Sequence, residues 1–174
     1  FAEALHRFDW LPDLIAAGPD GATEALRLTL EWRRVFGRWN AFSWDHEVMA
    51  RRVFNLACAA PALAARASDV EATGLAVDLA RQARDLLGPG RPETTAERAV
   101  CAAVAGAALR GEPGRRLLER ALAALSRALP LAIASDGGHA SRRPDLGLSL
   151  LFDLQTLDEA MIQRGLAAPD GIQR

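Results

Sequence analysis

One short segment, residues 133–144, carries side chains that can do chemistry in a chain that is otherwise largely apolar. His139 has an imidazole that titrates near neutral pH, and the planar guanidinium of Arg142 can bind a carboxylate or sulfate through two hydrogen bonds. Gly137 and Gly138 precede them and permit backbone conformations that are closed to other residues. The segment is therefore predicted to be a shaped loop. As alternatives, His139 only bonds to the backbone, and Arg142 lies on a solvated face.

A second group of candidate binding residues lies near the first third of the chain. Trp39 and Trp44 flank a short predicted loop, where exposed indoles can stack on a flat ligand such as a sugar ring, and Asn40 beside them can donate hydrogen bonds. Arg51 follows Trp44 along the next predicted helix and can face the same cleft. Core packing of the indoles, local capping by Asn40 and a structural salt bridge from Arg51 to Glu47 or a nearby acid remain open as alternatives.

The composition excludes several classes of function. Lys and Arg number 21 against 22 Asp and Glu, so the net charge of -1 disfavours a nucleic-acid-binding protein. No metal-ligand cluster, phosphate loop or dinucleotide fingerprint is present, so we expect neither a metal nor a cofactor. No stretch approaches the roughly 20 apolar residues of a membrane span. Cys58 and Cys101 are predicted to be buried, reduced thiols. Because the chain starts at Phe1, the N-terminus is expected to be missing, which leaves both the bacterial periplasm and the cytoplasm open.

The apolar pattern predicts an all-α protein, because Ala, Leu and Arg dominate and apolar positions recur every three or four residues. Ser68 with Glu71, and Thr94 with Glu97, have the spacing of capping boxes at helix starts. The predicted helices cover residues 21–36, 43–60, 69–87, 95–110, 113–129 and 145–164.

Glycine and proline mark the other predicted helix ends. Gly37 ends the first predicted helix, Pro144 opens the last, and Pro61 and Pro130 interrupt two others. The first helix is expected to bury one apolar stripe, made of Ala25, Leu28, Trp32 and Val35. Short linkers between the later helices favour antiparallel hairpins within a single helical domain, residues 1–174.

Four stretches, taken in order, resemble the helical half of heparinase II/III-like proteins, particularly an uncharacterised bacterial branch. They are residues 8–14 with the Trp32 helix, residues 39–44 leading into 50–53, the helix over 94–109, and the loop at 136–142 with its leucine-rich helix. The resemblance implies an incomplete (α/α) toroid built from helical hairpins, in a fragment whose C-terminal β-sandwich domain is absent. It also implies an acidic polysaccharide as partner and lyase chemistry by β-elimination.

The chain departs from the pattern of active lyases. β-Elimination needs a base, an acid and a group that neutralises the uronate carboxylate. The resemblance implies a tyrosine acid, but the chain has no tyrosine, and Leu146 stands where that residue is expected. His139 is then the one catalytic candidate.

Three hypotheses follow. The first is a lyase, or its substrate-binding helical domain, whose site binds substrate through Trp39, Asn40, Trp44, Arg51, His139 and Arg142. The second is a non-catalytic glycan-binding or envelope-biosynthesis protein with a degenerate lyase fold. The third is a helical scaffold with a protein partner. Convergence of the candidate side chains on one concave surface favours glycan binding, and their scatter favours the scaffold.

Overall fold

The computed structural model describes residues 1–88 and 94–166, and these residues form eight α-helices. Within those ranges the only extended pairing is an isolated bridge between Ile133 and His139, which confirms the all-α prediction. The helices are α1 (Ala2–Arg7), α2 (Leu11–Ala16), α3 (Pro19–Phe36), α4 (His46–Ala64), α5 (Asp69–Leu86), α6 (Ala96–Ala108), α7 (Gly111–Ala132) and α8 (Pro144–Gln163).

Helix α6 forms the centre of the molecule and packs against α4, α5, α7 and α8. Its residues are mostly alanine, and nearly all of them are buried. Small side chains let neighbouring backbones approach closely: a Cβ atom added at Gly106 would lie 2.6 Å from the backbone nitrogen of Leu118 on α7. A helix that is apolar all round is typical of an interior position, and here the sequence and the position agree.

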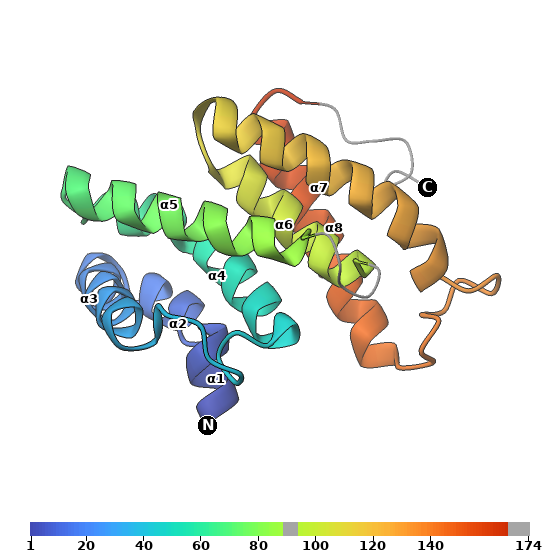
Figure 1. Cartoon of the computed structure of the whole chain (residues 1–174), viewed down its shortest axis with the longest axis horizontal. Coiled ribbons are helices and arrows are strands. Elements are labelled where there is room, and N and C mark those ends of the chain that lie inside the picture. Colours follow the sequence, from blue (N-terminus) through green and yellow to red (C-terminus); the bar gives the residue numbers. More distant parts are fainter. Residues whose placement is uncertain (89–93, 167–174) are drawn as a thin grey trace.

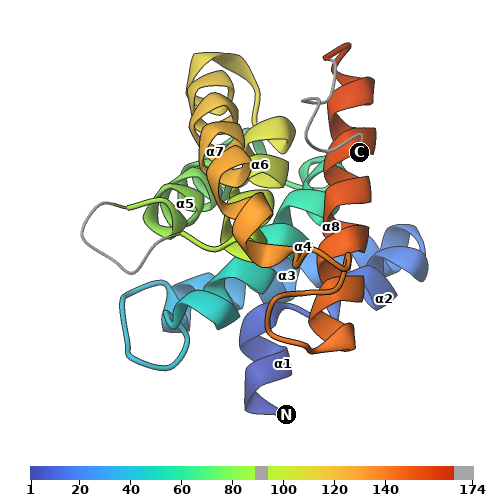
Figure 2. The ribbon, with the colours of Figure 1, turned by 90° about the vertical axis from the view of Figure 1, so that its right-hand side faces the viewer.

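The remaining helices lie on two sides of α4 (Figure 1). Helices α1, α2 and α3 pack on one side, while α6 joins α4 to α7 and α8 on the other. A short connection at residues 109–110 returns α7 onto α6, as predicted for a helical hairpin, and another at 65–68 returns α5 onto α4. The predicted link between α5 and α6 includes residues 89–93, which lie outside the described residues. Figure 2 shows α8 at the edge of this arrangement. The described helices do not by themselves show a toroid.

Several helix ends follow their local signals. Ser68 and Glu71 form a full capping box at the start of α5, and Gly37 follows the last residue of α3. Pro144 is the first residue of α8, and the two short helices α1 and α2 carry no strong sequence signal of their own. Local chemistry therefore fixes these boundaries where it is strong.

Other predicted ends are wrong. Pro61 and Pro130 lie inside α4 and α7 rather than interrupting them. Both prolines lie in the last turn, so each missing N–H removes a single hydrogen bond from a helix that is about to end. The N-cap of α6 is Thr95, whose side chain accepts from the amide of Arg98, and not Thr94.

Two burial predictions also need correction. In the predicted stripe of α3, Ala25 and Trp32 are buried, but Leu28 is half-buried and Val35 is 52% exposed. The buried face is rotated toward Ala22, Ala25, Leu26, Thr29 and Trp32. Both cysteines are free thiols, as expected, but only Cys101 is buried and Cys58 is exposed.

Candidate functional site

The loop between α7 and α8 is a tight hairpin. The backbone amide of Ala134 donates to the carbonyl of Gly138 (2.8 Å), and the amide of Ala140 donates to the carbonyl of Ala132 (2.7 Å). Gly137 has a φ of 82°, in the region that favours glycine, so this residue shapes the turn as the sequence predicts, whereas Gly138 has no positive φ.

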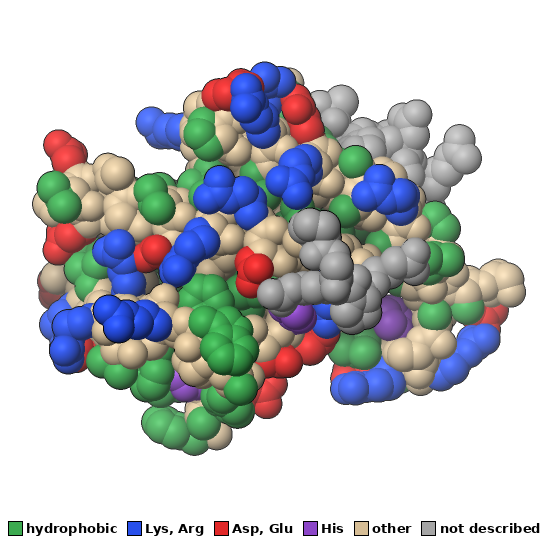
Figure 3. Space-filling model, in the orientation of Figure 1, with side chains coloured by type: hydrophobic (Ala, Val, Ile, Leu, Met, Phe, Trp, Pro, Cys, Tyr) green, Lys and Arg blue, Asp and Glu red, His purple; other side chains and the backbone are tan. Residues whose placement is uncertain are grey.

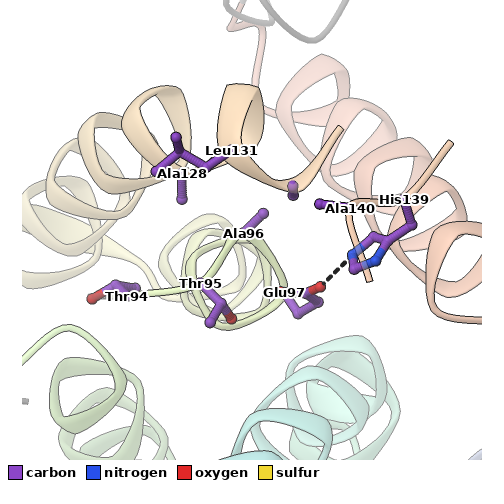
Figure 4. Close-up of a pocket in the computed structure, with 9 residues that line it drawn as sticks. Thr94, Thr95, Ala96, Glu97, Ala128, Leu131, His139 and Ala140 are labelled. Atoms are coloured by element: carbon purple, nitrogen blue, oxygen red, sulfur yellow. Dashed lines mark hydrogen bonds and ion pairs between the residues drawn. The ribbon is translucent and has the colours of Figure 1, made fainter. Parts of the chain in front are cut away.

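His139 lies at the base of this hairpin and faces the start of α6 (Figure 4). Its Nε2 lies 2.8 Å from Oε1 of Glu97, and its Nδ1 lies 2.7 Å from Oγ of Ser141. The backbone amide of Ser141 also donates to Nδ1 at 3.2 Å, which makes Nδ1 an acceptor and places the ring proton on Nε2, toward Glu97. The side chain of His139 is only 8% exposed.

Glu97 and His139 border a hollow of about 280 Å³. Its other walls are small or apolar and come from the start of α6, the end of α7 and the loop: Thr94, Thr95, Ala96, Ala128, Leu131, Ala132 and Ala140. Burial raises the pKa of Glu97, but hydrogen bonds from its own amide, from Thr95 and from His139 outweigh it and lower that pKa overall. Both ring nitrogens of His139 have hydrogen-bond partners within the protein, and the hydrogen bond between His139 and Glu97 joins the loop to α6.

Arg142 takes part in the same hairpin rather than in the hollow. Its Nη1 donates to Oδ2 of Asp136 at 2.5 Å, and Oδ1 of that carboxylate accepts from the amide of Gly138. The hydrogen bond from Arg142 lowers the pKa of Asp136. Arg142 also has a φ of 58°, which side-chain-bearing residues rarely adopt. The ion pair between Arg142 and Asp136 closes the turn.

Arg51 joins α4 to α8 through a bidentate ion pair. Its Nη1 and Nη2 donate to Oδ1 and Oδ2 of Asp153 at 2.9 and 2.6 Å, and its guanidinium lies 4.7 Å from the ring of Phe54. Burial opposes the charge of Arg51, but the hydrogen bonds to Asp153 raise its pKa above the ordinary value. The structural salt bridge left open for Arg51 is therefore present, but its acid is Asp153 and not Glu47, which pairs with Arg98.

The predicted aromatic group divides into one buried and one exposed indole. Trp44 is only 7% exposed and donates from Nε1 to the carbonyl of Phe36 at 3.1 Å, whereas Trp39 is 73% exposed. Asn40 holds the loop between them, because its Oδ1 accepts from the amides of Phe42 and Ser43 at 3.2 and 2.8 Å. This pattern is the local capping that the sequence left open.

Trp39 lines a hollow of about 430 Å³ beside α5. We call the group of Trp39, Arg81, Arg84 and the edge of Trp44 the Trp39 surface; Asp85 and Gly88 complete its lining. The Arg81 guanidinium lies 4.9 Å from the ring of Trp44 and donates to the carbonyl of Gly37. Figure 3 shows hydrophobic side chains gathered over this loop, with arginines flanking them along α5.

Arg52 is a buried charge that the sequence did not predict. It is 0% exposed and donates to Oε1 of Gln82 (2.8 Å) and to the carbonyls of His6 (2.8 Å) and Ser43 (2.7 Å). Its guanidinium lies 4.5 Å from the ring of Trp32, and burial lowers its pKa to about 9. The sequence signal that could have indicated the burial of Arg52 is its position on the stripe of α4 that faces the core.

The candidate side chains do not gather at one place. Trp39 and Asn40 lie in the α3–α4 loop and His139 and Arg142 in the α7–α8 loop, and both ribbon views show these loops apart. Among the residues that the structure covers, no three His, Cys, Asp or Glu side chains are grouped to hold a metal ion. No helix in residues 1–88 and 94–166 has the length and hydropathy to cross a membrane.

Comparison with known proteins gives one strong similarity. The chain is 58% identical over 175 residues to the FtsZ-localized protein C of Caulobacter vibrioides (strain NA1000 / CB15N). The match covers 100% of this chain but only 30% of that relative. No family model matches the chain, and no solved structure matches it.

This similarity overturns the heparinase II/III-like prediction. The relative is named for its localisation with FtsZ, and that name refers to no polysaccharide lyase, glycan-binding protein or acidic polysaccharide partner. The motifs behind the resemblance have structural reasons instead. Trp32 and Trp44 pack around Arg52, and the glycine-rich loop closes on itself through Asp136 and Arg142.

Proposed function

We propose that this chain is a helical domain of a longer, FtsZ-localised division protein, and that it acts by binding another protein. The observation that carries the proposal is the high identity to the Caulobacter relative along every part of the chain. The chain covers less than a third of the relative, so the proposal concerns this domain's share of the function.

The Trp39 surface supports a protein partner. Protein interfaces draw most of their binding energy from a few residues, among which Trp and Arg are enriched. The loop that presents Trp39 is fixed before binding by Asn40, by the buried indole of Trp44 and by the Arg81 hydrogen bond to Gly37. A preorganised loop loses little conformational entropy when a partner binds.

The charges around Trp39 indicate what this partner presents. Arg84 is exposed, and Arg81 is 48% exposed although it also pairs with Asp78 at 3.4 Å; Asp85 is the one acidic residue among the described residues that line the hollow. We propose that the partner segment carries an apolar side chain for Trp39 and acidic side chains for the two arginines. The internal hydrogen bonds of His139 support a structural role for that residue in this function.

The proposal is tested by imaging the longer protein, fused to a fluorescent label, in dividing cells. The native sequence is expected to gather at the division site only while FtsZ is present. Trp39→Ala is expected to weaken the binding of the purified protein to FtsZ about tenfold, which is the effect of a moderate hot spot.

Val77→Ala is the matched control, because Val77 is a similarly exposed apolar residue on α5 and lies outside the Trp39 surface. Localisation that is independent of FtsZ contradicts the division role. Localisation that is lost on FtsZ depletion but unaffected by Trp39→Ala contradicts only the assignment of the surface.

The incomplete (α/α) toroid stays a prediction about the longer protein. The hairpins α4–α5 and α6–α7, with their short connections, are units that such an array repeats. A structure of the longer protein in which further hairpins do not continue the array around a common axis would rule out the ring.

A further inference from the structure

Helix α8 is covered on one side only. Its buried residues, Leu150, Asp153, Leu157 and Met161, form one face, and α6 is the single described helix to which its backbone comes close. The opposite side carries four large apolar residues that are each more than half exposed. These residues, which we call the α8 outer face, are Leu148 (54%), Leu151 (60%), Phe152 (57%) and Ile162 (63%).

The four residues of the α8 outer face lie on one side of the helix, where the polar residues Gln155 and Glu159 stand between Phe152 and Ile162. Leu148, Leu151 and Phe152 follow the three- and four-residue steps of one face, and Ile162 lies on the same side near the other end. Apolar residues therefore run along both sides of α8. That distribution is typical of a helix that is packed on both sides, and single domains rarely leave apolar patches of this kind open.

The charges of α8 argue against a lipid surface as its cover. Helices that lie on membranes carry Lys and Arg along their polar side, which attract anionic lipid headgroups. Within Pro144–Gln163 the charged residues are all acidic; Asp153 is buried against Arg51 and Asp145 pairs with Arg143, so the carboxylates that would face a lipid surface are those of Asp158 and Glu159. An anionic surface would repel this helix.

We infer that the α8 outer face is the docking surface for another region of the same, longer polypeptide. The Caulobacter relative retains all of this domain but has about 70% of its length outside the match, since the chain covers 30% of it. A covalently linked region is present at high effective concentration, so an apolar face of moderate size is enough to bind it. The inference does not depend on FtsZ or on the Trp39 surface.

Cysteine labelling of the longer protein tests the inference directly. In a Cys58→Ser background, Leu151→Cys is compared with Val77→Cys, an exposed apolar position on α5. For each variant the labelling rate of the native protein is divided by the rate in denaturant. Residue 151 is expected to be protected at least tenfold more than residue 77. Equal protection of the two positions overturns the inference.

Two further measurements identify the occupant. Protection of residue 151 is expected to be the same at low and high protein concentration and in the absence of vesicles. Protection that disappears on dilution shows a second copy as the occupant, and protection that requires phosphatidylglycerol vesicles shows a membrane; either result overturns the inference. Leu151→Glu is expected to lower the melting temperature of the longer protein by several degrees, while Val77→Glu leaves it unchanged.

Discussion

Two adjacent arginines on α4, Arg51 and Arg52, have different kinds of hydrogen-bond partner in the protein interior. Arg51 pairs with the carboxylate of Asp153, which is 4% exposed, whereas the described partners of Arg52 are carbonyl and amide oxygens and aromatic rings. Removing a charge from water is costly, and both arrangements offset that cost with several hydrogen bonds. Because consecutive helical residues point about 100° apart, one arginine reaches α8 and the other reaches α1 and α5.

The Arg51–Asp153 pair is expected to stabilise the junction of α4 and α8. Asp153→Asn keeps the shape of the side chain but leaves Arg51 without its counter-charge. Because Arg51 is 22% exposed, we expect a loss of about 2 kcal/mol in the free energy of unfolding, below the range for a fully buried pair. Urea unfolding followed by circular dichroism measures it. The exposed Arg143–Asp145 pair gives the control, since Asp145→Asn should leave the midpoint unchanged.

His6 is expected to make stability depend on pH. Burial, and then the charge of Arg52, lower the pKa of His6 below its ordinary value of 6.5. Trp32 can only donate, and its Nε1 donates to Nδ1 of His6 at 2.9 Å, so the folded state holds the neutral ring. Below pH 6.5 the unfolded chain takes up a proton that the folded chain resists. Stability is therefore lost as the pH falls from 6.5 toward the folded pKa, and this contribution is constant above that range.

The measurement compares urea midpoints between pH 5 and 7.5 for the native chain and for His6→Gln, whose amide can still accept from Trp32. The midpoint of the native chain should fall relative to that of His6→Gln as the pH falls below 6.5. A difference that does not change with pH would show that His6 is not the group responsible.

At the scale of helices, the close packing of α6 on α7 depends on Gly106. Alanine is usually favoured over glycine inside a helix by about 0.5–1 kcal/mol. At position 106, however, the new methyl group would lie 2.6 and 2.8 Å from backbone atoms of Leu118, which cannot move without shifting α7. Gly106→Ala is therefore expected to lower the free energy of unfolding by about 2 kcal/mol.

Gly74→Ala on α5 is the matched control for Gly106→Ala. There the added methyl group meets only the guanidinium of Arg33, which is the movable end of a flexible side chain. Chemical denaturation should show an unchanged or slightly raised stability for Gly74→Ala. If both variants are equally stable, the backbones of α6 and α7 separate more easily than the contacts indicate.

Helix ends could be predicted from the sequence where a nearby residue decides them. Ser68 and Glu71 cap α5 because their partners lie within one turn, and Pro144 opens α8 for the same reason. Helices α1 and α2 have six residues each and are too short to be stable alone; Phe8 and Leu11, at most 1% exposed, hold them to the core. Such helices depend on packing, which local patterns do not report.

Across the whole molecule, the partners of the candidate residues could not be predicted. The loop shape around Gly137 is local and was predicted, but Glu97 is 42 residues from His139, and Asp153 is 102 residues from Arg51. Residue type alone does not show which distant carboxylate will contact a given histidine or arginine. The resemblance to a lyase failed for the same reason, because tryptophans, glycines and arginines in a similar order can serve packing and turns instead of a site.

The four tryptophans, at positions 10, 32, 39 and 44, all lie among α1–α3 and the loop before α4, and the chain has no tyrosine. Intrinsic fluorescence therefore reports on that end of the molecule, while α6, α7 and α8 emit nothing. Far-ultraviolet ellipticity, by contrast, samples every helix. Simultaneous recording of the two signals during heating would reveal whether both ends melt together.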